Sequence, residues 1–348
     1  MENQEKPHKR RVRYSGTHPK RFSEKYKEHQ PEKYADVVEK VIRKGSTPAG
    51  MHISICVKEI LDFLQIQPGQ KGLDATLGYG GHTLEMLKCL KGEGHIYGLD
   101  VDPIESEKTK ERLKKQGFGE DILTVKLLNF RNIDQVAEEA GKFDFVLADL
   151  GVSSMQIDNP ERGFSYKVDG PLDLRMNPQK GISAAERLKE VTQEELYGML
   201  LENADEPYAE EISKAVIRQR RIRPIETTTD LKQVIEQALS FIPEKERKEA
   251  VKKSCQRSFQ ALRIDVNSEF EVLYDFLDKL PQVLAPNGRT AILTFHSGED
   301  RLVKKSFKQF YKEGIYSDIC KDVIRPSQEE CARNSRAKST KMRWAIRA

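Results

Sequence analysis

The stretch from Lys71 to Asp100 constrains the fold of this 348-residue chain most strongly. A short strand pattern leads through Asp74 into the glycine-rich turn LGYGGHT, a helical pattern follows, and a second strand pattern, HIYGLD, ends in Asp100. Strand, turn, helix and strand in about 30 residues are typical of a βαβ unit with parallel strands. Ligands of open α/β sheets bind beyond the carboxyl ends of such strands. We therefore predict an α/β fold with a ligand site beside these carboxylates.

The glycine-rich turn also indicates which ligand to expect. Gly78, Gly80 and Gly81 would let the backbone approach a ligand, and the helix that follows offers free amides. A dinucleotide pattern needs a third glycine that this turn lacks, and the carboxylate of Asp74 disfavours a pyrophosphate. Asp100 suits a ribose diol, so S-adenosylmethionine fits the acids better. A structural βαβ unit with incidental glycines is the alternative.

A second region, Phe143 to Pro178, has the composition of a reaction site. It opens with an apolar run of the length expected for a buried strand, which ends in Asp149. The loop that follows interleaves aromatic residues with charges, and long loops of this kind in compact domains are usually functional or disordered. A solvated linker is the alternative. The charged residues of the loop include Asp158, Arg162, Asp169, Asp173 and Arg175.

Composition excludes some classes of protein. No apolar run approaches the roughly 20 residues that span a bilayer, and the N-terminus lacks an apolar signal-peptide core. We expect a cytoplasmic protein without a membrane partner. The five cysteines show no zinc-binding spacing, so we expect no metal. The net charge of +4 is too small to identify a partner by itself.

The remaining patterns divide the chain into parts. Strand patterns at 122–129, 289–296 and 342–346 extend the sheet, with a turn predicted at 284–288. Helical patterns with many Lys and Arg occupy 159–267, and four helices are expected near 184–188, 194–201, 208–223 and 231–239. Another helix is expected at 268–280. We predict a basic N-terminal extension over 1–50, a core made of 51–158 and 268–348, and an inserted helical unit over 159–267. The basic helices of the insertion favour nucleic-acid binding, and a solvated surface is the alternative.

In the N-terminal extension, Lys and Arg are interleaved with aromatic residues. Basic charge attracts phosphate, and rings can stack on unpaired bases, so nucleic-acid binding is one interpretation. A solubilising tail is the other. Helical spacing over 31–44 and again over 52–64 predicts helices on either side of a short linker.

Several longer motifs carry a resemblance to a known family. The stretches DATLGYGGHT, GLDVDP, ADLGVSSMQIDNPERGFSYKVDGPLDLRMNP, IETTTDL, FQALRIDVN, TFHSGEDRLVK and RPSQEECARN resemble the bacterial small-subunit rRNA (cytosine-N4) methyltransferases of the MraW, or RsmH, type. The resemblance covers the chain from about Met51 to its end. It implies a class I methyltransferase fold with a seven-stranded sheet and an α-helical insertion. It also implies S-adenosylmethionine as cofactor and, as partner, 16S rRNA of the small ribosomal subunit, methylated on N4 of a cytidine in the decoding centre.

The resemblance further implies particular site residues. Its cofactor contacts fall on Gly80, Gly81, His82, Asp100, Phe130, Asp149 and Gln156. The reaction needs a group that accepts a hydrogen from the cytosine amine, and Asp149 is our first choice because it ends a strand. Asp169, Asp173 and His296 are the further candidates for proton handling. An internal salt bridge is the alternative role for each charged residue of the loop.

The chain departs from the usual pattern of the family in three places. The extension before Met51 is additional, Gly298 stands where SFHSLEDR has Leu, and the usual NPRxRSAKLR is altered over Asn334 to Arg343. These departures leave open a paralogue that methylates an amino group of another RNA or of DNA. DNA amino-methyltransferases more commonly carry Asp-Pro-Pro-Tyr after this strand. A cofactor-binding ribosome-assembly factor without turnover is a second alternative, and the oligomeric state is not indicated.

Overall fold

The structure is a computed structural model that describes residues 54–348. A seven-stranded sheet lies at its centre, in the order β3-β2-β1-β4-β5-β7-β6. The strand β7 runs antiparallel to both of its neighbours, and the other pairs are parallel. This confirms the predicted α/β class. The strands are β1 (Lys71–Asp74), β2 (His95–Asp100), β3 (Leu123–Leu127), β4 (Phe143–Asp149), β5 (Leu284–Thr294), β6 (Tyr316–Ile319) and β7 (Lys341–Arg347).

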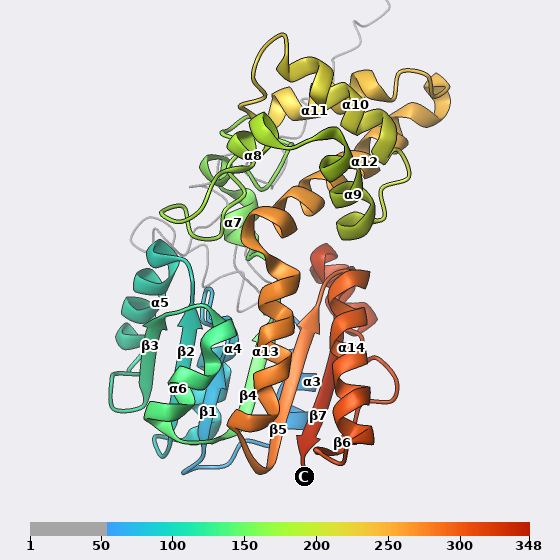
Figure 1. Cartoon of the computed structure of the whole chain (residues 1–348). Helices are drawn as coiled ribbons and strands as arrows, with labels where there is room; N and C mark the ends of the chain where they lie inside the picture. Colours follow the sequence, from blue (N-terminus) through green and yellow to red (C-terminus); the bar gives the residue numbers. More distant parts are fainter. Residues whose placement is uncertain (1–53) are drawn as a thin grey trace, which may run out of the picture. The chain divides into compact units, whose positions relative to one another are not determined.

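Helices cover both faces of the sheet, and the alternation of side chains along the strands explains why. In β4, Val146 and Ala148 point into one hydrophobic cluster, and Phe145 and Leu147 point into the other. On the first face lie α6 (Ile133–Ala140), α13 (Glu269–Val283) and α14 (Ser297–Lys312), which Figure 1 shows in front of the sheet. On the second face lie α3 (Val57–Leu64), α4 (Gly81–Leu90) and α5 (Pro103–Lys115).

The helices between β4 and β5 have a hydrophobic cluster of their own. Its buried residues run from Leu172 to Leu262 and come from this segment of the chain. The helices are α8 (Ala184–Glu190), α9 (Gln193–Ala204), α10 (Ala209–Arg220), α11 (Thr228–Ala238) and α12 (Glu244–Asn267). Ser268 is the single residue between α12 and α13, and its φ of 49° lies in the left-handed region. The change of direction therefore lies at the predicted boundary of the core.

Shorter elements complete the described chain. They are α7 (Ser154–Asp158), α15 (Gln328–Arg333) and the 3₁₀ turns η2 (Phe130–Asn132), η3 (Pro160–Arg162) and η4 (Ser335–Ser339). No helix among residues 54–348 is long and apolar enough to cross a membrane. The predicted helix at 31–44 and the basic extension lie outside the described residues.

Several elements differ from what the patterns predict. β6, the 24-residue α12 and the 16-residue α14 were not expected, and neither were the helices α5, α6, α7 and α15. The turn predicted at 284–288 is instead the beginning of β5, where the pairing with β4 is irregular between Phe143 and Phe145. Leu284 pairs with Phe143 and Arg289 with Phe145, so the four residues between them bulge out of the ladder, and Asn287 has the positive φ of 61° that suits a turn.

Candidate active site

Three carboxylates end three neighbouring parallel strands. The chain continues from β1 to β2 on one side of the sheet and returns through β4 on the other, so the order reverses between β1 and β4. Asp74 ends β1, Asp100 ends β2 and Asp149 ends β4. A crevice beside the carboxyl ends of the strands at such a reversal is where α/β sheets bind their ligands.

Two of these carboxylates hold the glycine-rich turn in place. Asp74 accepts hydrogen bonds from the Thr83 hydroxyl at 2.6 Å and from the Thr76 amide at 3.1 Å. Asp100 accepts from the amide of Gly78 at 2.8 Å and from that of Asp102 at 2.8 Å. Both acids therefore shape the loop around the predicted cofactor site.

The predicted glycines have the expected backbone role. Gly78 and Gly80 have φ values of 48° and 75°, which glycine adopts without the strain that a side chain would add. Gly81 is the first residue of α4. Phe130 lies just after β3, and its ring meets Phe276 of α13 edge to face at 5.1 Å between centroids.

Asp149 is in direct contact with His82. The His82 Nε2 lies 2.9 Å from the carbonyl oxygen of Ile55, which can only accept, so this nitrogen carries a hydrogen. The other ring nitrogen, Nδ1, lies 3.5 Å from an Asp149 carboxylate oxygen. The second oxygen of Asp149 is buried and has no hydrogen-bond partner among the described residues. The structure thus brings together two of the predicted residues and leaves one acceptor for a ligand.

Burial makes two of the carboxylates easy to protonate. Loss of hydration raises the pKa of Asp149 to about 6, His82 opposes the shift, and Asp74 and Glu299 add to it. Loss of hydration also raises the pKa of Asp100 to about 6, against its backbone hydrogen bond from Asp102. A cation bound nearby would offset the cost of keeping these groups ionised.

A buried ion pair that the patterns did not predict joins two loops of the site. Asp102 is fully buried, caps α5 and accepts from the guanidinium of Arg162 at 2.6 Å. The same oxygen accepts from the side-chain amide of Gln156 at 3.1 Å. Arg162 also donates to the carbonyl oxygens of Arg175 and Met176. The predicted cofactor residue Gln156 is therefore part of a clamp that holds the loop after β4.

The loop also contains a strained residue next to a predicted one. Leu174 has φ 63°, a conformation that costs free energy for a residue with a branched side chain. Asn267 at the end of α12 fixes it by donating to the Leu174 carbonyl at 2.8 Å and accepting from the Met176 amide at 2.7 Å. Beside it, Asp173 binds Arg175 through both carboxylate oxygens. The observed contacts of Asp173 therefore favour the salt-bridge role.

Asp169 has a different environment from the other predicted acids. It is exposed, and its carboxylate accepts from the Thr229 amide at 3.3 Å in the first turn of α11. The hydrogen bonds of Thr229 and Thr227 hold the pKa of Asp169 below its usual range. The contacts of Asp169 are with the helical insertion, whereas Asp149 contacts His82.

The fourth predicted acid–base residue, His296, follows β5 and faces a buried glutamate. Its Nε2 lies 3.2 Å from a carboxylate oxygen of Glu299, which also accepts from the Phe295 amide at 2.8 Å. The ring of Phe270 lies 5.8 Å from that of His296. A Cβ at Gly298 would come within 2.6 Å of the Phe270 ring and 3.2 Å of His296. The glycine that departs from the family pattern therefore makes room for this aromatic contact.

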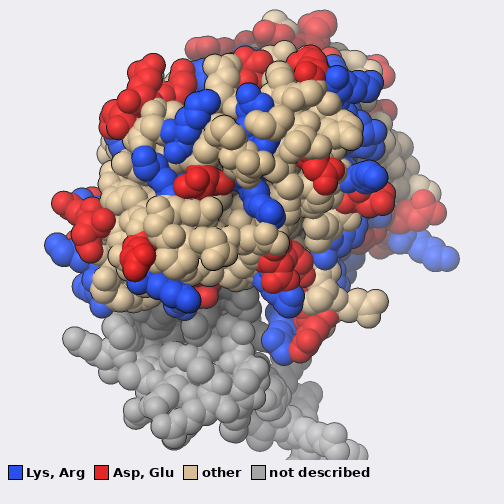
Figure 2. Space-filling view, turned by 90° about the horizontal axis from the view of Figure 1, so that it is seen from below, with Lys and Arg blue, Asp and Glu red and all other residues tan. Residues whose placement is uncertain are grey.

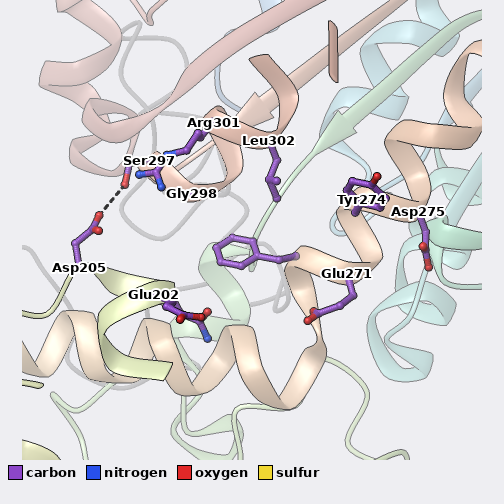
Figure 3. Close-up of a pocket in the computed structure, with 11 residues that line it drawn as sticks. Glu202, Asp205, Glu271, Tyr274, Asp275, Ser297, Gly298, Arg301 and Leu302 are labelled. Atoms are coloured by element: carbon purple, nitrogen blue, oxygen red, sulfur yellow. Dashed lines mark hydrogen bonds between the residues drawn. The ribbon is translucent and has the colours of Figure 1, made fainter. Parts of the chain in front are cut away.

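A cavity of about 410 Å³ lies next to this cluster (Figure 3). It is lined by the end of α9, the start of α13 and the start of α14, and the hydroxyl of Ser297 reaches Asp205 across it at 3.4 Å. Its wall is mainly acidic and aromatic, with one cation, Arg301. The lining residues are Glu202, Asn203, Asp205, Phe270, Glu271, Tyr274, Asp275, Ser297, Gly298, Arg301 and Leu302.

Two groups of described residues come close enough to share a metal ion. They are Cys56 with Glu59 and Glu330, and His296 with Glu269 and Glu299. In each group a glutamate already has a partner within the protein. Glu330 accepts from the Cys56 amide at 2.9 Å, and Glu269 binds Arg263 at 2.7 and 2.9 Å. We assign a metal to neither group.

The face seen in Figure 2 carries charged side chains of both signs. Figure 2 shows the face seen from below Figure 1, on which blue and red side chains are intermixed. No field of a single sign marks this visible face as a surface for a polyanion.

The residues present fit S-adenosylmethionine by their own chemistry. Its ammonium and sulfonium groups are cationic, and its ribose offers two hydroxyl donors. The site supplies three carboxylates whose pKa values are raised by loss of hydration, and one carboxylate oxygen without a partner among the described residues. A loop with two glycines of positive φ surrounds them. A cationic ligand with hydroxyl donors would therefore pair with these carboxylates, whereas a phosphate would be repelled by them.

Comparisons with known proteins agree with this chemistry. The chain is 74% identical over 348 residues to Ribosomal RNA small subunit methyltransferase H 1 of Lachnoclostridium phytofermentans, covering 100% of this chain and 95% of the relative. It is 69% identical over 347 residues to the protein of the same name in Agathobacter rectalis, covering 99% of each. Both relatives therefore match the basic extension as well as the core.

Among solved structures, the chain resembles a putative methyltransferase from Streptococcus mutans in complex with SAH. The TM-score is 0.41 at 12% identity, over 85% of this chain and 100% of that one. This likeness is too distant to say anything about function. The sequence model of the MraW methylase family, in contrast, matches residues 49–348. The chain belongs to the MraW methylase family.

Proposed function

We propose that this protein transfers a methyl group from S-adenosylmethionine to N4 of a cytidine in 16S rRNA of the small ribosomal subunit, in the cytoplasm. The observation that carries the proposal is the half-satisfied carboxylate of Asp149 at the carboxyl end of β4, which contacts His82 with one oxygen and has its other oxygen buried without a partner among the described residues. The names of the relatives support the substrate class. The cytosine position follows from the sequence motifs.

The chemistry explains why a carboxylate is needed there. The lone pair of the cytosine amine is delocalised into the ring, so the amine is a weak nucleophile. A carboxylate that accepts one N4 hydrogen raises electron density on nitrogen and takes the proton as the new N–C bond forms. Asp149 supplies this acceptor, and the contact with His82 stabilises the ionised carboxylate. When bound, S-adenosylmethionine supplies an electrophilic methyl group on a good leaving group.

Other residues hold the reactants. Asp74 and Asp100 keep the glycine-rich turn in shape, and we assign Asp100 to the ribose of the cofactor. The clamp of Asp102, Gln156 and Arg162 fixes the loop after β4 over the same end of the sheet. Holding the amine and the methyl group close together and aligned lowers the entropic contribution to the activation free energy. The helices of 159–267, with their separate hydrophobic core, are the part that we assign to RNA recognition, and the extension before Met51 adds further basic charge.

The function is tested by mapping N4-methylcytidine in 16S rRNA. Cells that lack the protein should lose one such modification, and the wild-type gene should restore it. A gene encoding Asp149→Asn should not restore it at equal protein level. Unchanged modification in the deletion strain would reject the proposed substrate, and loss of a methyl group in another RNA would identify the paralogue alternative.

Cofactor binding should depend on pH because Asp100 has to lose a proton. Its pKa in the free protein is about 6, and bound ribose donors and the cationic cofactor favour the ionised form. As pH falls through 6, protonation competes with binding, so affinity at pH 5 should be about tenfold weaker than at pH 7.5. Titration calorimetry measures the affinities at the two pH values. Repeating the titration in buffers of different ionisation enthalpy gives the number of protons that are released or taken up on binding.

The variant Asp100→Asn measures the contribution of this carboxylate to cofactor affinity separately from that of the neighbouring acids. It keeps an acceptor for only one of the two backbone amides, of Gly78 and Asp102, that bind Asp100, and it should bind the cofactor about 1 to 3 kcal/mol more weakly at pH 7.5, the size of a lost charge-assisted hydrogen bond. Its affinity should also change less with pH. Asp121→Asn, an exposed acid beside β3, is the control. Wild-type affinity in Asp100→Asn would remove Asp100 from the cofactor site.

A further inference from the structure

The outer side of α14 carries a row of cations. Arg301, Lys304, Lys305, Lys308 and Lys312 are all exposed, and their spacing of three and four residues places them on one side of the helix. The row extends about 17 Å along the helix axis. Val303 and Phe307 lie on the opposite side, buried against the sheet. We refer to these five residues as the α14 basic stripe.

No carboxylate neutralises the stripe. Within residues 54–348, no Asp or Glu lies within ion-pair distance of any of the five. Some exposed lysines on other helices do have such partners, as in Lys214 with Glu210 and Lys252 with Glu249. Others, such as Lys114 and Lys115 of α5, have no such partner among the same residues. Unpaired like charges along one helix repel each other and contribute nothing to folding. A structural role therefore does not explain the stripe.

The acids of α14 itself cannot compensate the stripe. The helix has only Glu299 and Asp300, both in its first turn. Glu299 is buried against His296, and Asp300 binds Lys341 and Arg343 of β7. These carboxylates hold the site and the sheet together. The positive charge on the outer side of the helix remains available to an external partner.

The position of the stripe connects it to the site. Arg301, its first residue, lines the cavity next to the His296 cluster (Figure 3). Tyr274, which lines the same cavity, has 66% of its surface exposed, and Tyr311, near Lys308 on the helix, has 47%. Cations interleaved with accessible rings are typical of surfaces that bind single-stranded nucleic acid.

We propose that the α14 basic stripe holds the phosphate backbone of the RNA segment next to the methylated nucleotide. The proposal rests on the proposed function, because it takes RNA as the substrate. It places an RNA contact on the catalytic core, in addition to the helical insertion. Lysines act here as point charges that neutralise phosphates and release counterions, so the stripe adds affinity without reading the base sequence.

The test compares two triple variants with the same change in charge. Lys304→Gln, Lys305→Gln and Lys308→Gln together neutralise the middle of the stripe and leave Arg301 in place. Lys108→Gln, Lys114→Gln and Lys115→Gln together neutralise exposed positions on α5, on the other face of the sheet. Binding of a 16S rRNA fragment that contains the target cytidine is measured between about 50 and 200 mM salt.

The stripe variant should lower the slope of log affinity against log salt by about 2, since each lost phosphate contact on a single strand contributes about 0.7. The α5 variant should change it much less. Cofactor affinity and the unfolding midpoint should be the same in both. Equal slopes in the two variants would overturn the proposal, as would a stripe variant that loses binding to anionic lipid vesicles but keeps the RNA slope.

The two proposals can fail separately. The salt slope needs only binding, whereas the proposed function needs methyl transfer by the wild-type protein. Binding with the expected slope but without methylation of the fragment or of small subunits would reject the function and leave the stripe as an RNA contact. Methylation with an unchanged slope would keep the function and reject the stripe.

Discussion

Replacing Asp149 with asparagine is expected to slow methyl transfer by about 10² to 10⁴-fold, the range that a positioned general base contributes. Asparagine has nearly the same shape, and the backbone amide at this position still donates to the Thr76 hydroxyl oxygen. What it loses is the ability to take the proton from the cytosine amine. Single-turnover rates with saturating cofactor and RNA measure this step directly.

The matched control for this variant lies on the same strand. Asp144→Asn makes the same chemical change at the other end of β4, where the carboxylate accepts only from the Lys71 amide and is far along the strand from the site. It should retain near-normal rates. If Asp149→Asn turns over as fast as Asp144→Asn, Asp149 is not the base, and His296 becomes the next candidate.

The pH dependence of the wild-type rate gives an independent check. Asp149 must be ionised to accept a proton, and burial raises its pKa to about 6. The single-turnover rate should therefore rise with pH and then level off, with a midpoint no higher than about 6, because the bound cationic cofactor favours the ionised carboxylate. Asp149→Asn should lose this step. A wild-type rate that falls as pH rises from 5 to 8, or a pH profile that is the same in Asp149→Asn, would contradict the assignment.

Arg162→Met is expected to cost about 3 to 5 kcal/mol of unfolding free energy, because it leaves the buried carboxylate of Asp102 without its cation. The side chains of both residues are at least nine-tenths buried, and their atoms are 2.6 Å apart. The loop after β4 should also lose its clamp, so methyl transfer should fall with stability. Urea unfolding followed by circular dichroism measures the first effect.

Arg187→Met is the control, since Arg187 binds Asp265 at 2.9 Å with both side chains about one quarter exposed. A solvated pair of this kind contributes about 0 to 1 kcal/mol. Adding Asp102→Asn to Arg162→Met should recover part of the loss by removing the unpaired charge, and asparagine still caps α5. Equal losses in the two arginine variants would show that burial of the pair does not decide its contribution.

The sequence determined the elements whose signals are local. β2 and the strand that ends at Asp149 were predicted to within a residue, because apolar runs bounded by polar residues need no distant partner to be recognised. The carboxylates at strand ends followed directly, since parallel strands present their carboxyl ends at one edge of the sheet. The long motifs were sufficient to identify the family, and the matching family model confirms it.

The sequence did not determine elements whose stability comes from their neighbours. β6 has four residues and depends on pairing with β7. α12 is rich in charged residues over 24 positions, so its buried side is hard to see as a pattern until the helical insertion packs around it. α14 follows the strand-end motif that contains His296, and its buried side consists of a few residues, such as Val303 and Phe307, that are recognisable only once they pack against the sheet.

Only the tertiary structure decided which polar residues act together. His82 meets Asp149 and Arg162 meets Asp102 across 67 and 60 positions of the chain, and Gly298 makes room for Phe270 of another helix. Such contacts depend on how strands and loops are brought together, which periodicity along the chain does not encode. The same holds for Asp173: its type and its place in a motif suggested proton handling, whereas its bidentate bond to Arg175 is a consequence of the loop conformation. The sequence thus identified which chemical groups are available at the site, and long-range packing determined which of them contact one another.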